Sequence, residues 1–445
     1  MTAKGDFSKG SVKRLVMAQA LPLTVAQTVN LLYNIVDRIY IGHLDAVGDL
    51  ALTGLGVTFP VIVIIAAFTS LFASGGSVLF SIARGKGDDG EASVALNNTF
   101  SLLCISSVVL FSVCFFLRRP ILFLFGAGEQ SFYYADEYLR IYLFGTAFSM
   151  LTTGLNGFIN AQGFPRIGML TTVIGAVINV VLDPVFIFLL GMGVRGAALA
   201  TVISQAVSAI WVLSFLCSKK MNVRLSVRRF GVKIYLLRKT VSLGLPGFVM
   251  QGTNSLVQIV CNNQLQAYGG EIYVGIMTVL MSVREMVSVP MMSISQGSQP
   301  IMSYNYGAKE YSRVKECIRF STVAGIAYTL VAWGVVMLIP NELMAIFTDS
   351  AETVNIGAKM LNIYFFGFFF MTFQSSGQTT FLALGKAKQA IFFSLFRKAI
   401  IVVPLTLLLP LFVGVEGVFL AEPISNAVGG LAAFTAMWFM IYRKI

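Results

Sequence analysis

The sequence is poor in charged residues and almost free of histidine. Only 12% of its 445 residues are Asp, Glu, Lys or Arg, whereas a soluble domain carries about 25%. This composition excludes an ordinary soluble protein. The single histidine, His43, belongs to no Ser-His, Cys-His or H-E-x-x-H arrangement, so the chain offers no recognisable catalytic centre. We therefore do not expect an enzyme.

Cysteine is also scarce, and it is scattered. The five cysteines lie in or beside apolar runs, at Cys104, Cys114, Cys217, Cys261 and Cys317. Their spacing matches no metal site, and their odd number argues against a disulfide framework. We interpret them as small apolar core residues, and we expect the chain to need no cofactor.

Basic residues outnumber acidic ones, 32 to 20, but their placement does not indicate nucleic-acid binding. They concentrate in short segments between apolar runs, as the positive-inside rule describes for membrane proteins. We expect no nucleic-acid partner. The basic segment 219–239 is predicted to be a cytoplasmic linker that lies against anionic lipid headgroups.

Apolar runs of the length that crosses a bilayer recur along the whole chain. They lie near 15–36, 53–82, 93–117, 138–161, 167–190, 196–217, 240–266, 274–303, 317–339, 357–383, 389–412 and 415–441. The predicted fold class is an all-α polytopic membrane protein with 12 transmembrane helices. The charge bias between spans predicts that both termini are cytoplasmic, and we see no cleavable signal peptide before the first span.

The two halves of the chain resemble each other. GVRGAALATVISQAV (193–207) aligns with GVEGVFLAEPISNAV (414–428), and LPLTVAQTVNLL (21–32) aligns with LPGFVMQGTNSL (245–256). Such a repeat indicates a duplication of six helices. We predict an N-lobe (1–218), the basic linker and a C-lobe (240–445), pseudo-symmetric about an axis along the membrane normal.

A polar stripe follows one face of the first predicted helix: Gln27, Asn30, Asn34 and Asp37. Unpaired polar groups are costly in hydrocarbon, so this face must contact protein or water. The second half repeats the amides at Gln251, Asn254 and Gln258 but places Cys261 where Asp37 stands. We predict that the six amides contribute to a substrate cavity.

Asn179 and Asp183 form a second stripe in the fifth helix. Together with Asp37, this gives two carboxyl groups with neighbouring amide oxygens in one lobe. Such a group could bind Na⁺, or one Asp could exchange a proton. Alternatively, Asp183 only accepts hydrogen bonds beside a kink at Pro184.

Five charged residues fall within apolar runs of the second half: Arg284, Glu285, Arg397, Lys398 and Glu422. Ion pairing is the first interpretation, for example of Arg397 or Lys398 with Glu422. The alternative is that Arg397 or Lys398 helps move the lobes when the acidic lobe changes its charge.

The tenth predicted helix mixes aromatic and amide side chains: Phe369, Phe373, Gln374 and Gln378. This mixture suits a permissive pocket for flat amphiphilic cations. Alternatively, half of the aromatic residues face lipid.

Several short motifs, in order along nearly the entire chain, resemble the MATE (multidrug and toxic compound extrusion) transporters. They are VDRIYIGHL, ARGKGD, GFPR, NVVLDP, GVRGAALAT, SYNYGAKEYSRV and ALGKAKQ. The resemblance is closest to the bacterial branch with an N-lobe cation site, and it implies cation-coupling residues at Asp37, Asn179, Asp183 and Thr201. Another branch has a Glu on its seventh helix, whereas the seventh predicted helix of this chain contains no acidic residue.

The resemblance implies a bacterial inner-membrane antiporter, in which H⁺ or Na⁺ enters as an organic, often cationic, compound leaves. We expect the partners to be amphiphilic drugs and membrane lipids, and the chain to be a monomer. One alternative is a lipid-linked oligosaccharide flippase of the same superfamily, favoured by Arg284, Arg397 and Lys398 but not by Asp37 and Asp183. A major-facilitator carrier would need a basic second-to-third loop motif that we do not find.

Overall fold

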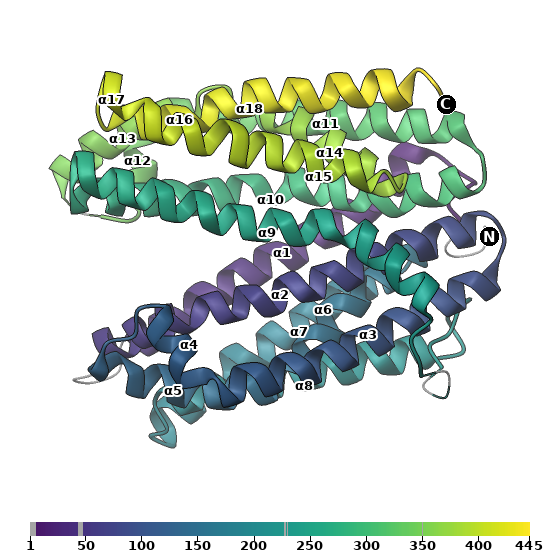
Figure 1. Ribbon diagram of the computed structural model, residues 1–445, viewed down its shortest axis with the longest axis horizontal. Helices are drawn as coiled ribbons and strands as arrows, with labels where there is room; N and C mark the ends of the chain where they lie inside the picture. Colours follow the sequence, from purple (N-terminus) through teal and green to yellow (C-terminus); the bar gives the residue numbers. More distant parts are fainter. Residues whose placement is uncertain (1–5, 43–47, 227, 229, 349) are drawn as a thin grey trace. The chain divides into compact units, whose positions relative to one another are not determined.

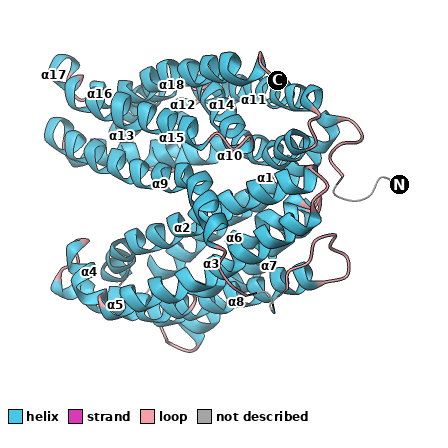
Figure 2. Cartoon of the chain, turned by 45° about the vertical axis from the view of Figure 1, so that its right-hand side comes forward, coloured by secondary structure: helices cyan, strands magenta, loops and turns pink. Residues whose placement is uncertain are grey.

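The computed structural model describes residues 6–42, 48–226, 228, 230–348 and 350–445. Within these residues the regular structure is helical and no strand occurs, as Figure 2 shows. His43 lies outside the described residues. The chain divides into two compact units, each of which is considered by itself.

The first unit comprises Met1–Lys9 and Pro22–Gly244, and the second comprises Gly10–Leu21 and Leu245–Ile445. The first eight helices and one π-helical segment are α1 (Val12–Gly42), α2 (Gly48–Gly85), α3 (Asp89–Phe116), α4 (Arg118–Leu124), α5 (Glu129–Phe144), α6 (Thr146–Ala161), α7 (Pro165–Pro184), η1 (Val185–Leu189) and α8 (Val194–Cys217). The remaining elements are α9 (Ile234–Gly269), α10 (Glu271–Gly307), α11 (Tyr311–Leu338), α12 (Pro340–Ala345), α13 (Ala351–Phe365), α14 (Phe370–Ala383), α15 (Ala387–Leu395), η3 (Phe396–Val402), α16 (Val403–Leu408), α17 (Pro410–Val413), α18 (Glu416–Met437) and η4 (Trp438–Tyr442).

Two helices are divided between the units at the Leu-Pro pair that the repeat shares. In α1 the division falls between Leu21 and Pro22, and in α9 it falls just before Leu245, which precedes Pro246. The N-terminal part of each of these helices therefore belongs to the other unit. The internal repeat is therefore also visible in where the two helices are divided between the units.

Nine helices in the described part of the chain are long and apolar enough to cross a membrane, and the pair α13 and α14, bent by 48°, makes a tenth. The other two expected spans fall on α9 and on α5 with α6. Helix α9 is long enough but carries many amides, and α5 and α6 are 16 residues each, separated at Gly145. The fold class is confirmed as all-α, and a layout of twelve helical spans in two units is consistent with these helices.

Local sequence signals set several helix starts. Asp88 caps α3 by accepting a hydrogen bond from the Glu91 backbone N–H at 2.8 Å, which satisfies one of the free donors of the first turn. Pro165 opens α7 at a position where its missing N–H costs nothing. These caps separate successive spans by short turns.

A π-helical segment interrupts the corresponding span of each unit, close to charged residues. In the first unit α7 ends at Asp183 and Pro184 and continues as η1. In the second unit α15 continues as η3, which contains Arg397 and Lys398, and Pro404 follows in α16. Proline lacks the N–H of a regular helix, and π-helical turns are frequent at functional sites.

The basic segment 219–239 is attached to the first unit by hydrogen bonds to α3. Asn97 Oδ1 accepts from the Ser226 backbone N–H and Asn98 Oδ1 accepts from the Lys233 backbone N–H, both at 2.9 Å. Its buried apolar side chains are Met221, Val223 and Leu225. Its described charged side chains are exposed: Lys219, Lys220, Arg224, Arg228, Lys233, Arg238 and Lys239. The segment is thus held to protein, and its charges remain available to lipid headgroups.

The core of the second unit lies where α10, α13 and α18 meet. Leu280, Phe365 and Phe419 are fully buried in one cluster with Tyr364 at its edge. Burial of such side chains stabilises a helix bundle through close packing. This cluster supports the charged residues described below.

Candidate functional site

The first unit holds a buried polar group between α7 and α8. Asn179 donates from Nδ2 to Asp183 Oδ1 at 3.2 Å and to Thr201 Oγ1 at 3.4 Å. Thr201 in turn donates to the Ala197 backbone carbonyl at 3.0 Å. Asn179 is 1% exposed and Asp183 is 0% exposed. A single amide therefore connects the carboxyl group of α7 to the hydroxyl group of α8.

Asp37 of α1 joins this group. Its carboxyl group lies within hydrogen-bonding range of the carboxyl group of Asp183 and interacts with it electrostatically. The opposite oxygen of each α7 side chain, Asn179 Oδ1 and Asp183 Oδ2, is buried without a hydrogen-bond donor among the described residues. The structure thus brings together Asp37, Asn179, Asp183 and Thr201, which we call the acidic site.

Tyr138 of α5 also belongs to the acidic site, although no sequence pattern indicated it. Its phenol is 4% exposed, contacts the Thr201 side chain and interacts electrostatically with Asp37. Tyr142, four residues later, stacks on Tyr138 with ring centroids 5.8 Å apart. Tyr138 and Tyr142 are four residues apart and so share one helix face, and this spacing was the only signal in the sequence. The charged neighbours Asp136, Glu137 and Arg140 made the segment look like an exposed one.

The chemistry of the acidic site favours a small cation. An ionised carboxylate only accepts hydrogen bonds, so two carboxyl groups at this range must share a proton or a cation. The remaining oxygens of Asn179, Asp183 and Thr201 are the hard ligands that alkali and alkaline-earth cations prefer. Among the described residues, no group of three or more His, Cys, Asp or Glu is placed so that it could hold a metal ion.

The amides predicted for a substrate cavity lie on α1 and α9. Gln27 and Gln251 are half-buried, while Asn30, Asn254 and Gln258 are exposed. The side chain of Asn34 lies outside what the structure describes. The repeated stripe therefore occupies matching positions of two helices, and its role remains a prediction.

The aromatic and amide residues of α14 form two groups of contacts. Gln374 donates to Gln378 Oε1 at 3.5 Å, and Gln378 contacts the sulfur of Met250 in α9 at 3.7 Å. Phe369 packs edge-on against Trp333, with centroids 5.6 Å apart, and Phe373 packs against Phe434. Gln374 is 6% exposed, and its Oε1 receives no hydrogen bond within the described chain. Gln378 thus contacts α9, Gln374 contacts Gln378, and the two phenylalanines pack against other aromatic rings.

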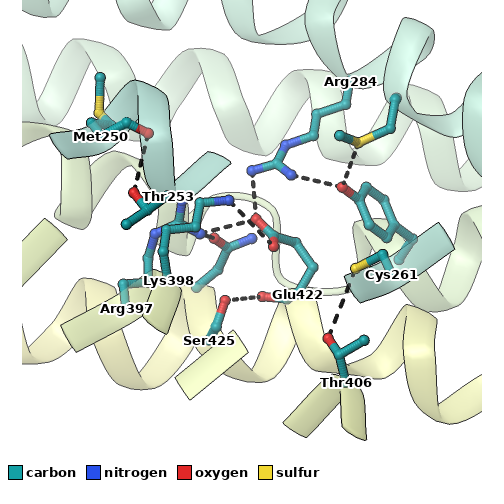
Figure 3. A network of polar contacts seen from close by, with 12 residues as sticks. Met250, Thr253, Cys261, Arg284, Arg397, Lys398, Thr406, Glu422 and Ser425 are labelled. Atoms are coloured by element: carbon teal, nitrogen blue, oxygen red, sulfur yellow. Dashed lines mark hydrogen bonds and ion pairs between the residues drawn. The ribbon is translucent and has the colours of Figure 1, made fainter. Parts of the chain in front are cut away.

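The second unit contains a group of opposite charge, the basic cluster, which Figure 3 shows. Glu422 Oε1 accepts from Arg284 Nη2 at 2.5 Å and from Arg397 Nη1 at 2.9 Å. The Lys398 amine lies 3.8 Å from Glu422 Oε2. Asn426 Oδ1 accepts a second bond from Arg397 Nη1 at 3.0 Å. Three of the five predicted intramembrane charges therefore meet on the carboxylate of a fourth, Glu422.

The fifth, Glu285, is placed elsewhere. It is exposed on α10 and forms no ion pair with any described residue. Tyr364 takes part instead: its hydroxyl accepts from Arg284 Nη1 at 2.6 Å and contacts the Met281 sulfur at 3.2 Å. Glu285 follows Arg284 directly, and adjacent residues of a helix point in different directions.

Comparison with known proteins gives matches over the whole chain. A family model described as MatE matches residues 22–185 and 246–408, one segment in each half. The multidrug export protein MepA of Staphylococcus haemolyticus is 25% identical over 441 residues, which cover 98% of this chain and 94% of that protein.

Solved structures give the same fold. An outward-facing multidrug resistance MATE family transporter of the MOP superfamily is 23% identical, with a TM-score of 0.90 over 100% of this chain and 99% of that one. A MATE in complex with MaL6 is 22% identical, with a TM-score of 0.93 over the same shares of the two chains.

Proposed function

Because this chain belongs to the MATE family of multidrug efflux transporters, we propose that it exports organic, often cationic, compounds in exchange for H⁺ or Na⁺. It is a multi-pass protein of the bacterial cell membrane. The observation that supports coupling to a cation is the pairing of Asp37 with Asp183 in the acidic site. Both carboxyl groups lie on spans, where an ionisable residue is a functional candidate by default.

Coupling requires that the cation and the exported compound favour different states of the transporter. In the proposed cycle, a proton or Na⁺ neutralises the Asp37 and Asp183 pair and so changes how strongly α1 is attracted to or repelled from α7. Asn179 and Thr201 hold the Asp183 side chain in place through the hydrogen bonds described above. Release of the cation restores the repulsion and permits alternating access.

The side chains of α14 support an amphiphilic substrate. Phe373 of α14 and Phe369, the N-cap residue just before it, offer aromatic faces, and Gln374 and Gln378 offer amide groups on α14. Rings and amides together bind flat organic cations without a fixed geometry. We assign these residues to substrate binding, together with the amides of α1 and α9.

The test is transport by the full-length protein in liposomes. Efflux of a fluorescent organic cation is followed under an imposed pH gradient and, separately, under a Na⁺ gradient. We expect one gradient to drive transport in the wild type and neither to do so in Asp37→Asn. The matched control is Asp136→Asn, because Asp136 pairs with Arg118 at 2.6 Å on α5 and is not part of the acidic site; it should retain gradient-driven transport.

Equal transport by wild type and Asp37→Asn would contradict the cation site. Failure of the wild type to respond to either gradient, with scrambling of lipid-linked oligosaccharides in the same vesicles, would indicate the flippase instead. Circular dichroism and size-exclusion profiles of each variant separate loss of coupling from loss of fold.

A further inference from the structure

The basic cluster holds more positive charge than its carboxylate neutralises. Three cationic side chains, Arg284, Arg397 and Lys398, are in contact with Glu422 alone among the acidic groups that the structure describes. The side chains of Arg397 and Lys398 are each 9% exposed. Buried charges are normally paired, because an uncompensated charge in low dielectric is costly.

The hydrogen bonds of Arg397 converge on two neighbouring acceptors. Its Nη1 donates to Glu422 Oε1 and to Asn426 Oδ1. The Lys398 amine forms an ion pair with Glu422 Oε2 at 3.8 Å, a distance longer than a hydrogen bond. In Figure 3 the Lys398 amine points toward the same carboxylate as the two guanidinium groups. Three cationic groups therefore converge on one carboxylate.

The corresponding position of the first unit has the opposite polarity. Glu422 aligns with Thr201 in the internal repeat, and Cys261 aligns with Asp37. In the second unit Cys261 lies 3.8 Å from the Thr406 hydroxyl and within electrostatic range of Glu422, Lys398 and Arg284. The duplication has therefore turned one internal site acidic and the other basic.

We propose that the basic cluster is a binding site for a singly charged anionic group, supplied either by the carboxylate of an organic compound or by chloride. Arg397 and Lys398 donate to the anion, and Glu422 with Asn426 holds Arg397 in position. Charge-assisted hydrogen bonds from a guanidinium and an ammonium group suit a carboxylate oxygen or a halide. The site is independent of the cation coupling proposed above, because it lies entirely within the second unit.

Isothermal titration calorimetry on the purified full-length protein tests this site. Potassium benzoate, potassium chloride and neutral benzyl alcohol are titrated separately in a Tris sulfate buffer, which contains neither Na⁺ nor a singly charged buffer anion. We expect saturable binding of benzoate or chloride and none of benzyl alcohol. Benzoate binding without chloride binding identifies an organic carboxylate as the ligand; the reverse identifies the inorganic anion.

The decisive variant is Lys398→Met, which keeps the length of the side chain and removes its charge. Anion affinity should fall about tenfold or more, since one charge-assisted contact is lost. Lys398→Arg should retain binding, and the control Lys359→Met should match the wild type because Lys359 is 65% exposed and pairs with Glu416.

Absence of binding by both anions to the wild type would overturn the proposal, as would unchanged affinity in Lys398→Met. If Lys398→Met does not fold, Lys398→Arg provides the test. This variant keeps the positive charge, so a folded Lys398→Arg protein that no longer binds the anion would also contradict the proposal. Transport driven by a cation gradient is measured separately with Asp37→Asn, so the two proposals can fail independently.

Discussion

At the scale of single residues, two buried carboxyl groups have opposite surroundings. Asp183 lies beside Asp37, an amide and a hydroxyl group. Glu422 lies beside two guanidinium groups and an amine. A carboxyl group beside another carboxyl group must share a proton or a cation, whereas one that faces three cations stays ionised and structural. Substitution should therefore affect coupling at Asp183 and stability at Glu422.

Thr201→Val tests the hydroxyl group of the acidic site. Valine has the shape of threonine but cannot accept from Asn179 Nδ2, so one amide donor loses a partner. A lost buried hydrogen bond costs about 1–3 kcal/mol, and we expect gradient-driven efflux to weaken severalfold while the protein stays folded. Thr201→Ser keeps the hydroxyl group and should behave as the wild type in the same liposome assay. Equal efflux by both variants would remove Thr201 from the site.

Glu422→Gln tests the structural role of the central carboxylate. Removing one partner of a buried ion pair costs about 3–5 kcal/mol, since the cations are left unpaired. We expect a clearly lower midpoint of thermal unfolding, and a smaller effect on which drugs are exported. Glu416→Gln is the control: its pair with Lys359 is exposed and should contribute about 1 kcal/mol or less. A stable Glu422→Gln protein with an altered drug profile would indicate a role in substrate selection.

At the scale of elements, close helix contacts depend on glycine where the first part of α9 packs on α2. A side-chain carbon at Gly244 would lie 1.6 Å from the Leu71 backbone oxygen. A side-chain carbon at Gly75 would lie 2.0 Å from the Thr240 backbone oxygen. Backbone atoms cannot move aside as a flexible side chain does, so these helices can approach only without side chains at the contact.

Gly244→Ala should separate α9 from α2. We expect a loss of about 1–3 kcal/mol or more in stability, as for overpacked cores, measured as the thermal unfolding midpoint and the yield of folded protein. Gly252→Ala in the same helix meets nothing within 4 Å and should be neutral or stabilising by about 0.4–1 kcal/mol. Equal stability of the two variants would show that α9 packs on α2 more loosely than the structure indicates.

At the scale of the whole molecule, the chain divides into two compact units that share a repeated sequence pattern and differ in their internal charges. The first unit contains the acidic site and the second the basic cluster. Binding groups of both polarities, each on its own scaffold, would suit a transporter of compounds that carry either charge. The basic segments between spans predict how the scaffolds are oriented in the membrane.

Cysteine labelling tests the predicted orientation with both termini cytoplasmic. Cys217 is exposed at the end of α8, next to the basic segment, and we expect a membrane-impermeant maleimide to label it only in inverted vesicles. In a cysteine-free background, Gln130→Cys, exposed near the start of α5, should be labelled only in right-side-out cells. The opposite pattern would reverse the assigned topology.

The sequence by itself determined the class of fold, the repeat and the family. Twelve apolar runs, the Leu-Pro pairs and the motif order are local features, since a bilayer selects helices by length and apolarity alone. Asp37, Asn179 and Asp183 could be identified from the sequence as candidate site residues, because polar residues are rare at membrane depth. Thr201 came from the family resemblance, and the structure places it with the other three.

Only the tertiary structure decided which side chains meet. Tyr138 beside Thr201, three cations on Glu422, Glu285 apart from them and the anchoring of the basic segment on α3 all depend on helix rotation and on contacts between distant segments. Helical periodicity defines a face but not its partner, because most spans are apolar over most of their surface and many rotations bury similar area. Packing of close contacts, such as Gly244 against Leu71, selects one of these rotations.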